Sequence, residues 1–162
     1  MHPNFFFQQL WNDYIQMAPQ AERIENLFRL RGEAIAHDHV AFRTLNLPPI
    51  QLSSLETQLF SLGYQRQQSY QFPEKKLNAW GYIHIDSLMP KIFLSELLCE
   101  SFSATVQEIL TKICQQIDPQ HIQKPSVFWS GRLWAPISWQ EYQSLLAESE
   151  YAAWVCLLYT SD

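Results

Sequence analysis

The segment His37-Asp38-His39-Val40-Ala41-Phe42-Arg43-Thr44 has the clearest potential for chemistry in this sequence. In an extended strand alternate side chains share a face, so His37, His39, Ala41 and Arg43 would project to one side. Neutral imidazole is the commonest metal ligand, and a guanidinium can hold a carboxylate through two hydrogen bonds. At roughly 3.3 Å per residue, His39 and Arg43 would lie about 13 Å apart. The pattern predicts a wet cavity in which a metal and an anion clamp hold different ends of one substrate.

The same residues also fit plainer interpretations. His39 and Arg43 could be solvated on a surface strand, or the imidazole could bond a neighbouring carboxylate. Glu96 is a second candidate, because a carboxylate in an apolar strand is costly unless it is paired or coordinated, although it could also reach solvent at a strand end. Lys75 and Lys76 follow a predicted turn, where a solvated hairpin end competes with contact to an anion.

The elements that must position these residues follow from the apolar periodicity. Residues at helical spacing predict one helix from Pro3 to Met17 and another from Pro19 to about Gly32, with Ile24, Leu27 and Phe28 on one face. The residues at 37–45 lack helical spacing and favour a strand.

Downstream of this strand the pattern alternates between helix and strand. Ser53-Ser54-Leu55-Glu56 is typical of a capping box at the start of a helix that ends at Gly63. Three strands are then predicted, and they cover 64–72, 77–85 and 92–98. The order is β-α-β-β-β.

The carboxyl-terminal third is predicted to be helical. Apolar residues from Val106 to Ile117 recur at helical spacing, and Ser138-Trp139-Gln140-Glu141 predicts a second capping box, with Ser149 as a further cap. No internal repeat or linker separates these elements, which favours one domain of the α+β class.

Composition narrows the functional classes. The chain has 162 residues, of which 47% are hydrophobic and 14% aromatic, and this composition is that of a folded domain. The net charge is −5 with scattered Lys and Arg, which argues against nucleic acid as a partner. Cys99, Cys114 and Cys156 lack metal-site spacing and are expected to be buried free thiols in a reducing cytoplasm. Neither a leader segment nor a membrane-spanning run of about 20 apolar residues is expected.

Four ordered motifs resemble those of the 2-oxoadipate dioxygenase/decarboxylase family. They are Asp38–Thr44, Leu62–Tyr64, Tyr70–Leu77 and Pro90–Leu97. That family is similar to vicinal-oxygen-chelate enzymes, in which β-α-β-β-β modules pair around a metal. The resemblance therefore implies a vicinal-oxygen-chelate-like β-α-β-β-β module with additional N- and C-terminal helices, whose second module is missing from this chain.

The resemblance also implies a reaction and a set of site residues. Fe(II), held by two His and one Glu, would bind a 2-oxo acid and O2, and a 2-oxoadipate-like acid would give a 2-hydroxyglutarate-like acid and CO2, as in lysine catabolism. His39 matches the first metal ligand and Arg43 the catalytic residue that grips the substrate carboxylate. Lys76 is expected to assist substrate binding, and Glu96 is a weaker metal candidate. In the family the second His and the Glu lie downstream of a segment like Ser149–Trp154, outside this chain.

The expected organisation follows from that comparison. Residues 1–154 would form the N-terminal part of one metalloenzyme domain, and 155–162 would be a non-native tail, so this fragment is expected to be inactive. Partners would be a small 2-oxo acid and O2, with no prediction of oligomeric state. Two alternatives remain open: a vicinal-oxygen-chelate lyase or isomerase that uses another metal, and a non-catalytic carboxylate-binding module in which His39 is structural.

Overall fold

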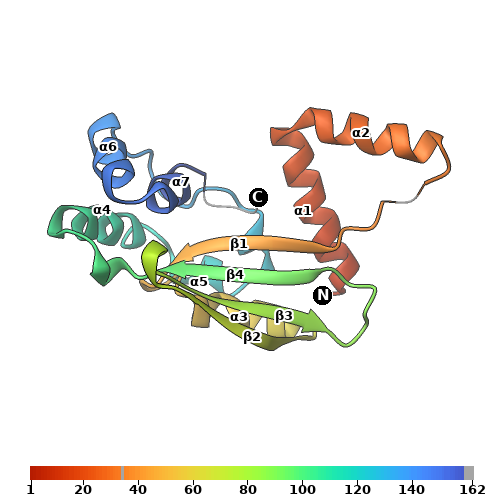
Figure 1. The fold of residues 1–162 in the computed structure, drawn as a ribbon, viewed down its shortest axis with the longest axis horizontal. Coiled ribbons are helices and arrows are strands. Elements are labelled where there is room, and N and C mark those ends of the chain that lie inside the picture. Colours follow the sequence, from red (N-terminus) through yellow and green to blue (C-terminus); the bar gives the residue numbers. More distant parts are fainter. Residues whose placement is uncertain (34, 159–162) are drawn as a thin grey trace.

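The centre of the molecule is a four-stranded mixed sheet. The structure is a computed structural model that describes residues 1–33 and 35–158. The strand order is β1-β4-β3-β2; β1 runs parallel to β4, and β3 is antiparallel to both of its neighbours (Figure 1). The strands are β1 (His39–Leu45), β2 (Tyr64–Phe72), β3 (Leu77–His84) and β4 (Lys91–Leu97).

The helix α3 (Leu52–Ser61) connects β1 to β2 and confirms the predicted β-α-β-β-β order. It packs on one face of the sheet, where Leu52, Leu55 and Leu59 are buried. Gly63 follows α3 with a φ of +92°, a conformation that only glycine adopts without strain. This turn sends the chain directly into β2.

The remaining helices except α5, which lies behind the middle of the sheet, flank its two ends (Figure 1). At the amino end of β1 lie α1 and α2, and at the carboxyl ends of β1 and β4 gather α4, α6 and α7. Their bounds are α1 (Pro3–Met17), α2 (Pro19–Leu30), α4 (Ala104–Cys114), α5 (Pro119–Ile122), α6 (Trp139–Glu148) and α7 (Glu150–Leu158). Three short 3-10 helices complete the fold, at Pro73–Lys75, Cys99–Ser101 and Pro125–Phe128.

Strand register divides the sheet into two unlike faces. The face against α3 carries Phe42 and Leu94, which are paired across β1 and β4 and buried in the core. The rings of Phe6 and Phe128 pack on Phe42, with centroid distances of 6.3 and 4.4 Å. The opposite face carries the side chains of His39, Ala41 and Arg43, as their alternation predicted.

A polar network ties α3 to the sheet. The carboxylate of Glu56 accepts two hydrogen bonds from Arg66 at 2.6 and 2.7 Å and a third from the Tyr82 hydroxyl at 2.9 Å. The guanidinium of Arg66 also stacks on the Trp80 ring at 4.4 Å. Because Glu56 is buried, these three bonds offset the cost of taking its charge out of water.

The structure confirms several element predictions and corrects three. The capping box of α6 is present, with Ser138 and Glu141 bonded reciprocally, and the Ser149 hydroxyl accepts a hydrogen bond from the Ala152 amide. The predicted box at Ser53 is wrong, because α3 already begins at Leu52. The first strand begins at His39, so His37 lies outside it, with its ring 5.2 Å from that of Trp11.

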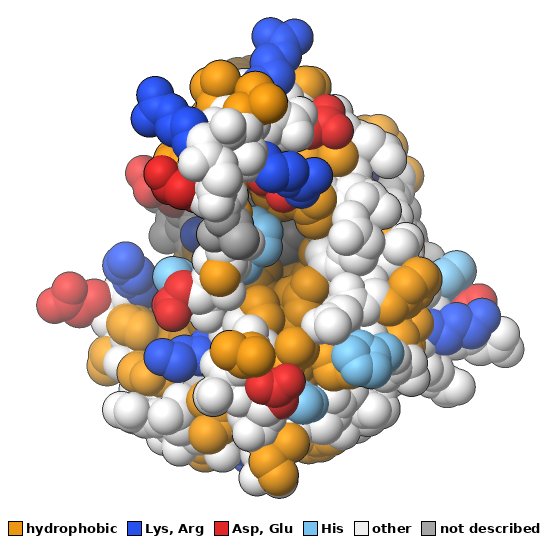
Figure 2. Space-filling model, turned by 90° about the vertical axis from the view of Figure 1, so that its right-hand side faces the viewer, with side chains coloured by type: hydrophobic (Ala, Val, Ile, Leu, Met, Phe, Trp, Pro, Cys, Tyr) orange, Lys and Arg blue, Asp and Glu red, His pale blue; other side chains and the backbone are white. Residues whose placement is uncertain are grey.

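The third correction concerns α2. All 12 of its residues are described, and none is buried. Its predicted apolar face, with Ile24 and Leu27 more than half exposed, therefore does not pack on the described part of the chain. Figure 2 shows hydrophobic side chains scattered over this end of the molecule.

The three cysteines are buried free thiols, as predicted. Burial raises the pKa of Cys99 and of Cys114 to about 12, so both are protonated at neutral pH. Within residues 1–33 and 35–158, no helix combines the length and apolar character needed to cross a membrane.

Candidate active site

The candidate site lies on the face of the sheet turned away from α3. Here β1 and β4 are paired in three successive rows, which join His39 to Lys91, Ala41 to Phe93 and Arg43 to Ser95. Paired residues share a face, so these six side chains form the floor of the site. Two hollows open on this floor, one near each end of β1.

The larger hollow is a cleft of about 610 Å³ beside Arg43. Aromatic rings and charged groups both contribute to its walls, which come from β1, β4, the β2–β3 turn and the start of α7. Its main lining residues are Arg43, Phe72, Lys75, Lys76, Phe93, Ser95, Phe102, Glu148, Tyr151 and Trp154. Glu74 and Glu150 also line the cleft, so its walls carry both basic and acidic side chains among the aromatic rings. A cleft of this size can hold a small molecule.

Two aromatic rings of α7 hold the guanidinium of Arg43. Its central carbon lies 4.3 Å from the centre of the Trp154 ring and 5.9 Å from that of Tyr151. Such cation–π contacts favour one orientation of the planar group. Arg43 is thus supported from α7 while it faces the cleft.

The hydroxyl of Tyr151 anchors α7 to both central strands. It accepts a hydrogen bond from the Thr44 amide at 3.0 Å and lies 2.8 Å from the carbonyl oxygen of Ser95, to which it can donate. The Ser95 hydroxyl is also within 3.0 Å. Burial raises the pKa of Tyr151 above its usual value, so this hydroxyl stays protonated and neutral.

The structure brings Lys76 into the same cleft as Arg43. Lys76 has a left-handed backbone with a φ of +54°, at the end of the turn between β2 and β3. Its ammonium donates a hydrogen bond to the Ser101 carbonyl at 2.7 Å and lies 4.0 Å from the centre of the Phe102 ring. Together with Lys75, which also lines the cleft, Arg43 and Lys76 give it three cationic side chains from two separate parts of the chain.

The second hollow, of about 400 Å³, lies beside His39. The imidazole is 67% exposed, and its Nδ1 lies 3.1 Å from the carboxylate of Asp38. This contact agrees with the interpretation in which the His39 imidazole bonds a neighbouring carboxylate. It also leaves Nε2 as the ring nitrogen turned away from Asp38, so binding of a metal at Nε2 is compatible with the contact.

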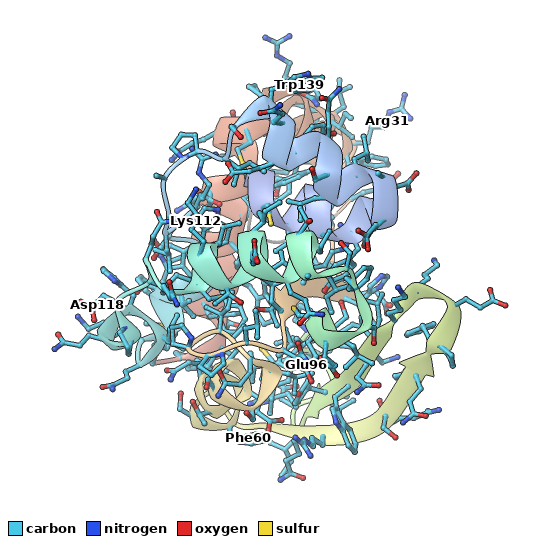
Figure 3. The ribbon with its side chains drawn as sticks, turned by 90° about the vertical axis from the view of Figure 1, so that its left-hand side faces the viewer. Arg31, Phe60, Glu96, Lys112, Asp118 and Trp139 are labelled. Atoms are coloured by element: carbon cyan, nitrogen blue, oxygen red, sulfur yellow. The ribbon has the colours of Figure 1, made fainter. Side chains whose placement is uncertain are left out.

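Glu96 does not share a site with His39. It is paired with Thr44, on the face of the sheet that α3 covers, and its carboxylate accepts a hydrogen bond from the Leu52 amide at 2.8 Å. Figure 3 shows Glu96 near the start of α3. Burial raises the pKa of Glu96, which the bond from Leu52 partly opposes. The structure therefore gives Glu96 the role of a helix cap and not of a ligand beside His39.

The metal centre implied by the resemblance is not complete among the residues that the structure describes. Within the described residues, no three His, Cys, Asp or Glu side chains gather as they would around a metal ion. His39 with Asp38 provides at most one end of such a site, because useful affinity requires three or more ligands in fixed geometry.

Comparison with known proteins identifies the family of this chain. The model of the family described as 2-oxoadipate dioxygenase/decarboxylase matches residues 8–160. The chain belongs to this family. The match includes most of the segment 155–162 that was expected to be a non-native tail; Val155 and Cys156 are buried in α7, and 159–162 lie outside the described residues.

Two curated relatives are plant proteins of the same description. The 2-oxoadipate dioxygenase/decarboxylase of Oryza sativa subsp. japonica is 33% identical over 153 residues, which cover 87% of this chain and 42% of that protein. The Arabidopsis thaliana protein is 28% identical over 160 residues, which cover 90% of this chain and 43% of that protein. The chain thus spans less than half the length of these relatives.

Solved structures share the fold. A proposed hydrolase from Shewanella frigidimarina NCIMB 400 is 42% identical with a TM-score of 0.92, over 99% of this chain and 64% of that one. The hydroxyglutarate synthase of Oryza sativa, solved in complex with 2-oxoadipate, is 30% identical with a TM-score of 0.85, over 98% and 56%. A proposed glyoxalase-superfamily protein from Ralstonia eutropha JMP134, at 18% identity and a TM-score of 0.74 over 88% and 55%, shows the fold alone.

Proposed function

We propose that the complete protein is an Fe(II)-dependent dioxygenase/decarboxylase that converts a 2-oxo dicarboxylic acid into a 2-hydroxy acid. For 2-oxoadipate the products would be 2-hydroxyglutarate and CO2, with one O2 consumed and no external reductant. The observation that carries the proposal is Arg43, held by Trp154 in a cleft on the sheet face that also bears His39. Family membership and the rice structure with 2-oxoadipate support the choice of substrate.

In this proposal the chain binds and orients the substrate. Arg43 holds the carboxylate distant from the reacting end through two parallel hydrogen bonds. Lys76 adds positive charge to the cleft, and the rings of Phe102 and Trp154 keep water from that carboxylate. His39 would supply one imidazole for iron, and the other ligands would come from outside these 162 residues.

Restoring the remaining segment provides the test. The complete protein should bind iron and show O2 uptake that depends on 2-oxoadipate, whereas the 162-residue chain alone should show neither. A complete protein that contains no iron and consumes no O2 with 2-oxoadipate would contradict the proposal.

A lyase or isomerase with another divalent metal is the second candidate, and the fold shared with the glyoxalase-superfamily protein favours it. Such an enzyme needs no O2. Turnover of the substrate under strictly anaerobic conditions would therefore support this candidate, and its loss would support the dioxygenase.

A carboxylate-binding module without catalysis is the third candidate, and the incomplete ligand set among the described residues favours it. In that case His39→Ala would leave the affinity for a dicarboxylate nearly unchanged.

We propose a cytoplasmic location for the protein, which the three buried free thiols support.

A further inference from the structure

Phe93 lies between the two ends of the proposed site. It stands on β4 opposite Ala41, which separates His39 from Arg43 along β1. On its other side Phe93 is paired with Gly81 of β3. Its ring therefore rises from a row of small residues, and it lines both the hollow beside His39 and the cleft beside Arg43.

Two neighbouring rings support Phe93 from the side of β2. The ring centroids of Tyr70 and Phe72 lie 5.4 and 6.5 Å from that of Phe93, both at steep interplanar angles. A Cβ atom added at Gly81 would lie 3.5 Å from Cε2 of Tyr70, so the Tyr70 ring extends over this glycine. The three rings form one wall beside Ala41, which is apolar except for the Tyr70 hydroxyl, 3.9 Å from the Cβ position at Gly81.

A substrate that is bound at both ends of the proposed site must lie alongside this wall. Arg43 and His39 project from the same face of the same strand, so a molecule that reaches both lays its central carbon atoms over Ala41 and beside Phe93. A methylene chain gains apolar contact there. A branch at this point would meet the Phe93 ring.

We propose that Phe93 is a specificity-determining residue that selects an unbranched methylene chain between the two ends of the substrate. This inference rests on the proposed function and adds to it: the accepted class is linear 2-oxo dicarboxylic acids, and acids with a branch at mid-chain are rejected.

The test compares kcat/KM for 2-oxoadipate and for its 4-methyl derivative in the complete protein. The natural sequence should prefer the straight acid by at least about tenfold, since one carbon atom more or less in an apolar pocket is worth roughly 10–200-fold. Phe93→Ala should reduce this preference by about tenfold or more, and Phe93→Leu, which keeps much of the apolar volume, should fall between. Phe60→Ala is the matched control, because Phe60 is 44% exposed on α3, and it should leave the preference unchanged (Figure 3).

Each outcome decides a separate point. Equal preference in the natural protein and both Phe93 variants, with circular dichroism showing folded proteins, overturns the role of Phe93 and leaves the proposed function intact. Failure of the natural complete protein to consume 2-oxoadipate overturns the proposed function and this inference with it. If Phe93→Ala does not fold, the Phe93→Leu variant decides by the same ratio.

Discussion

Tyr151 connects Arg43, which we propose to bind the substrate, to α7, which supports it. Its hydroxyl bonds to Thr44, next to Arg43 in β1, and to Ser95, the partner of Arg43 in β4. A single side chain thus fixes α7 against the strands next to the contact between Trp154 and the Arg43 guanidinium.

We predict that Tyr151→Phe lowers the free energy of unfolding by about 1–3 kcal/mol, because the buried Thr44 amide loses its hydrogen-bond partner. Urea denaturation measures the change. Tyr142→Phe in α6, where the ring stacks on Trp139, is the matched control and should stay within about 0.5 kcal/mol. Equal effects of the two substitutions would show that the Tyr151 hydroxyl does not carry this stability.

Arg43→Lys tests the geometry with which Arg43 is proposed to bind the substrate carboxylate. Lysine keeps the charge but loses the planar group that stacks on Trp154 and the paired hydrogen bonds to a carboxylate. We expect kcat/KM of the complete protein for 2-oxoadipate to fall by at least about tenfold, while the thermal midpoint stays close to that of the natural protein. Arg29→Lys on α2, where the side chain is 70% exposed, should change neither quantity.

The sequence predicted which side chains of the first strand share a face, because that alternation is a local property of an extended chain. It did not predict the direction of Glu96. The face on which a β4 residue lies relative to His39 depends on the register between two strands, and this register is fixed by the packing of the whole sheet.

At the scale of elements, the stability of the first turn of α6 depends on pH. The Glu141 carboxylate accepts hydrogen bonds from Lys112 and from Ser138, which lower its pKa to about 2. The unfolded chain, with a value near 4.5, binds this proton more readily, so the stabilisation is complete above pH 4.5 and is lost as the pH falls towards 2.

We predict that Glu141→Gln is less stable than the natural chain at pH 6 by up to about 1 kcal/mol, as for other helix caps. The difference should shrink steadily between pH 4.5 and 2, because protonation removes the same charge from the natural side chain. Thermal unfolding of both proteins across this range measures it. A difference that is constant with pH would contradict the role of the Glu141 charge.

Element bounds were predictable where the signal is local. The helix from Pro3 to Met17 and the strand from Tyr64 to Phe72 match the prediction residue for residue. The start of α3 was missed because its first amide is capped by Glu96, which is 44 positions further along the chain. When the cap comes from a distant strand, the residues next to the helix do not indicate where the helix begins.

At the scale of the whole molecule, iron binding should require more than this chain. The described residues gather no set of three metal ligands. We predict that the 162-residue chain retains less than a stoichiometric amount of iron after desalting, that the complete protein retains about one equivalent per chain, and that His39→Ala in the complete protein loses most of it. Elemental analysis measures all three. Retention of iron by the His39→Ala protein would exclude His39 as a ligand.

The parallel pairing of β1 with β4 has a consequence for synthesis of the protein. β1 emerges from the ribosome early, but its partner is encoded only after α3, β2 and β3 have been made. Until then the strand that carries His39 and Arg43 has no neighbour to complete its hydrogen bonds, and it is exposed to chaperones and to other nascent chains. Synonymous codons that slow translation between residues 46 and 90 should therefore reduce the yield of folded protein more than the same codons placed after residue 97.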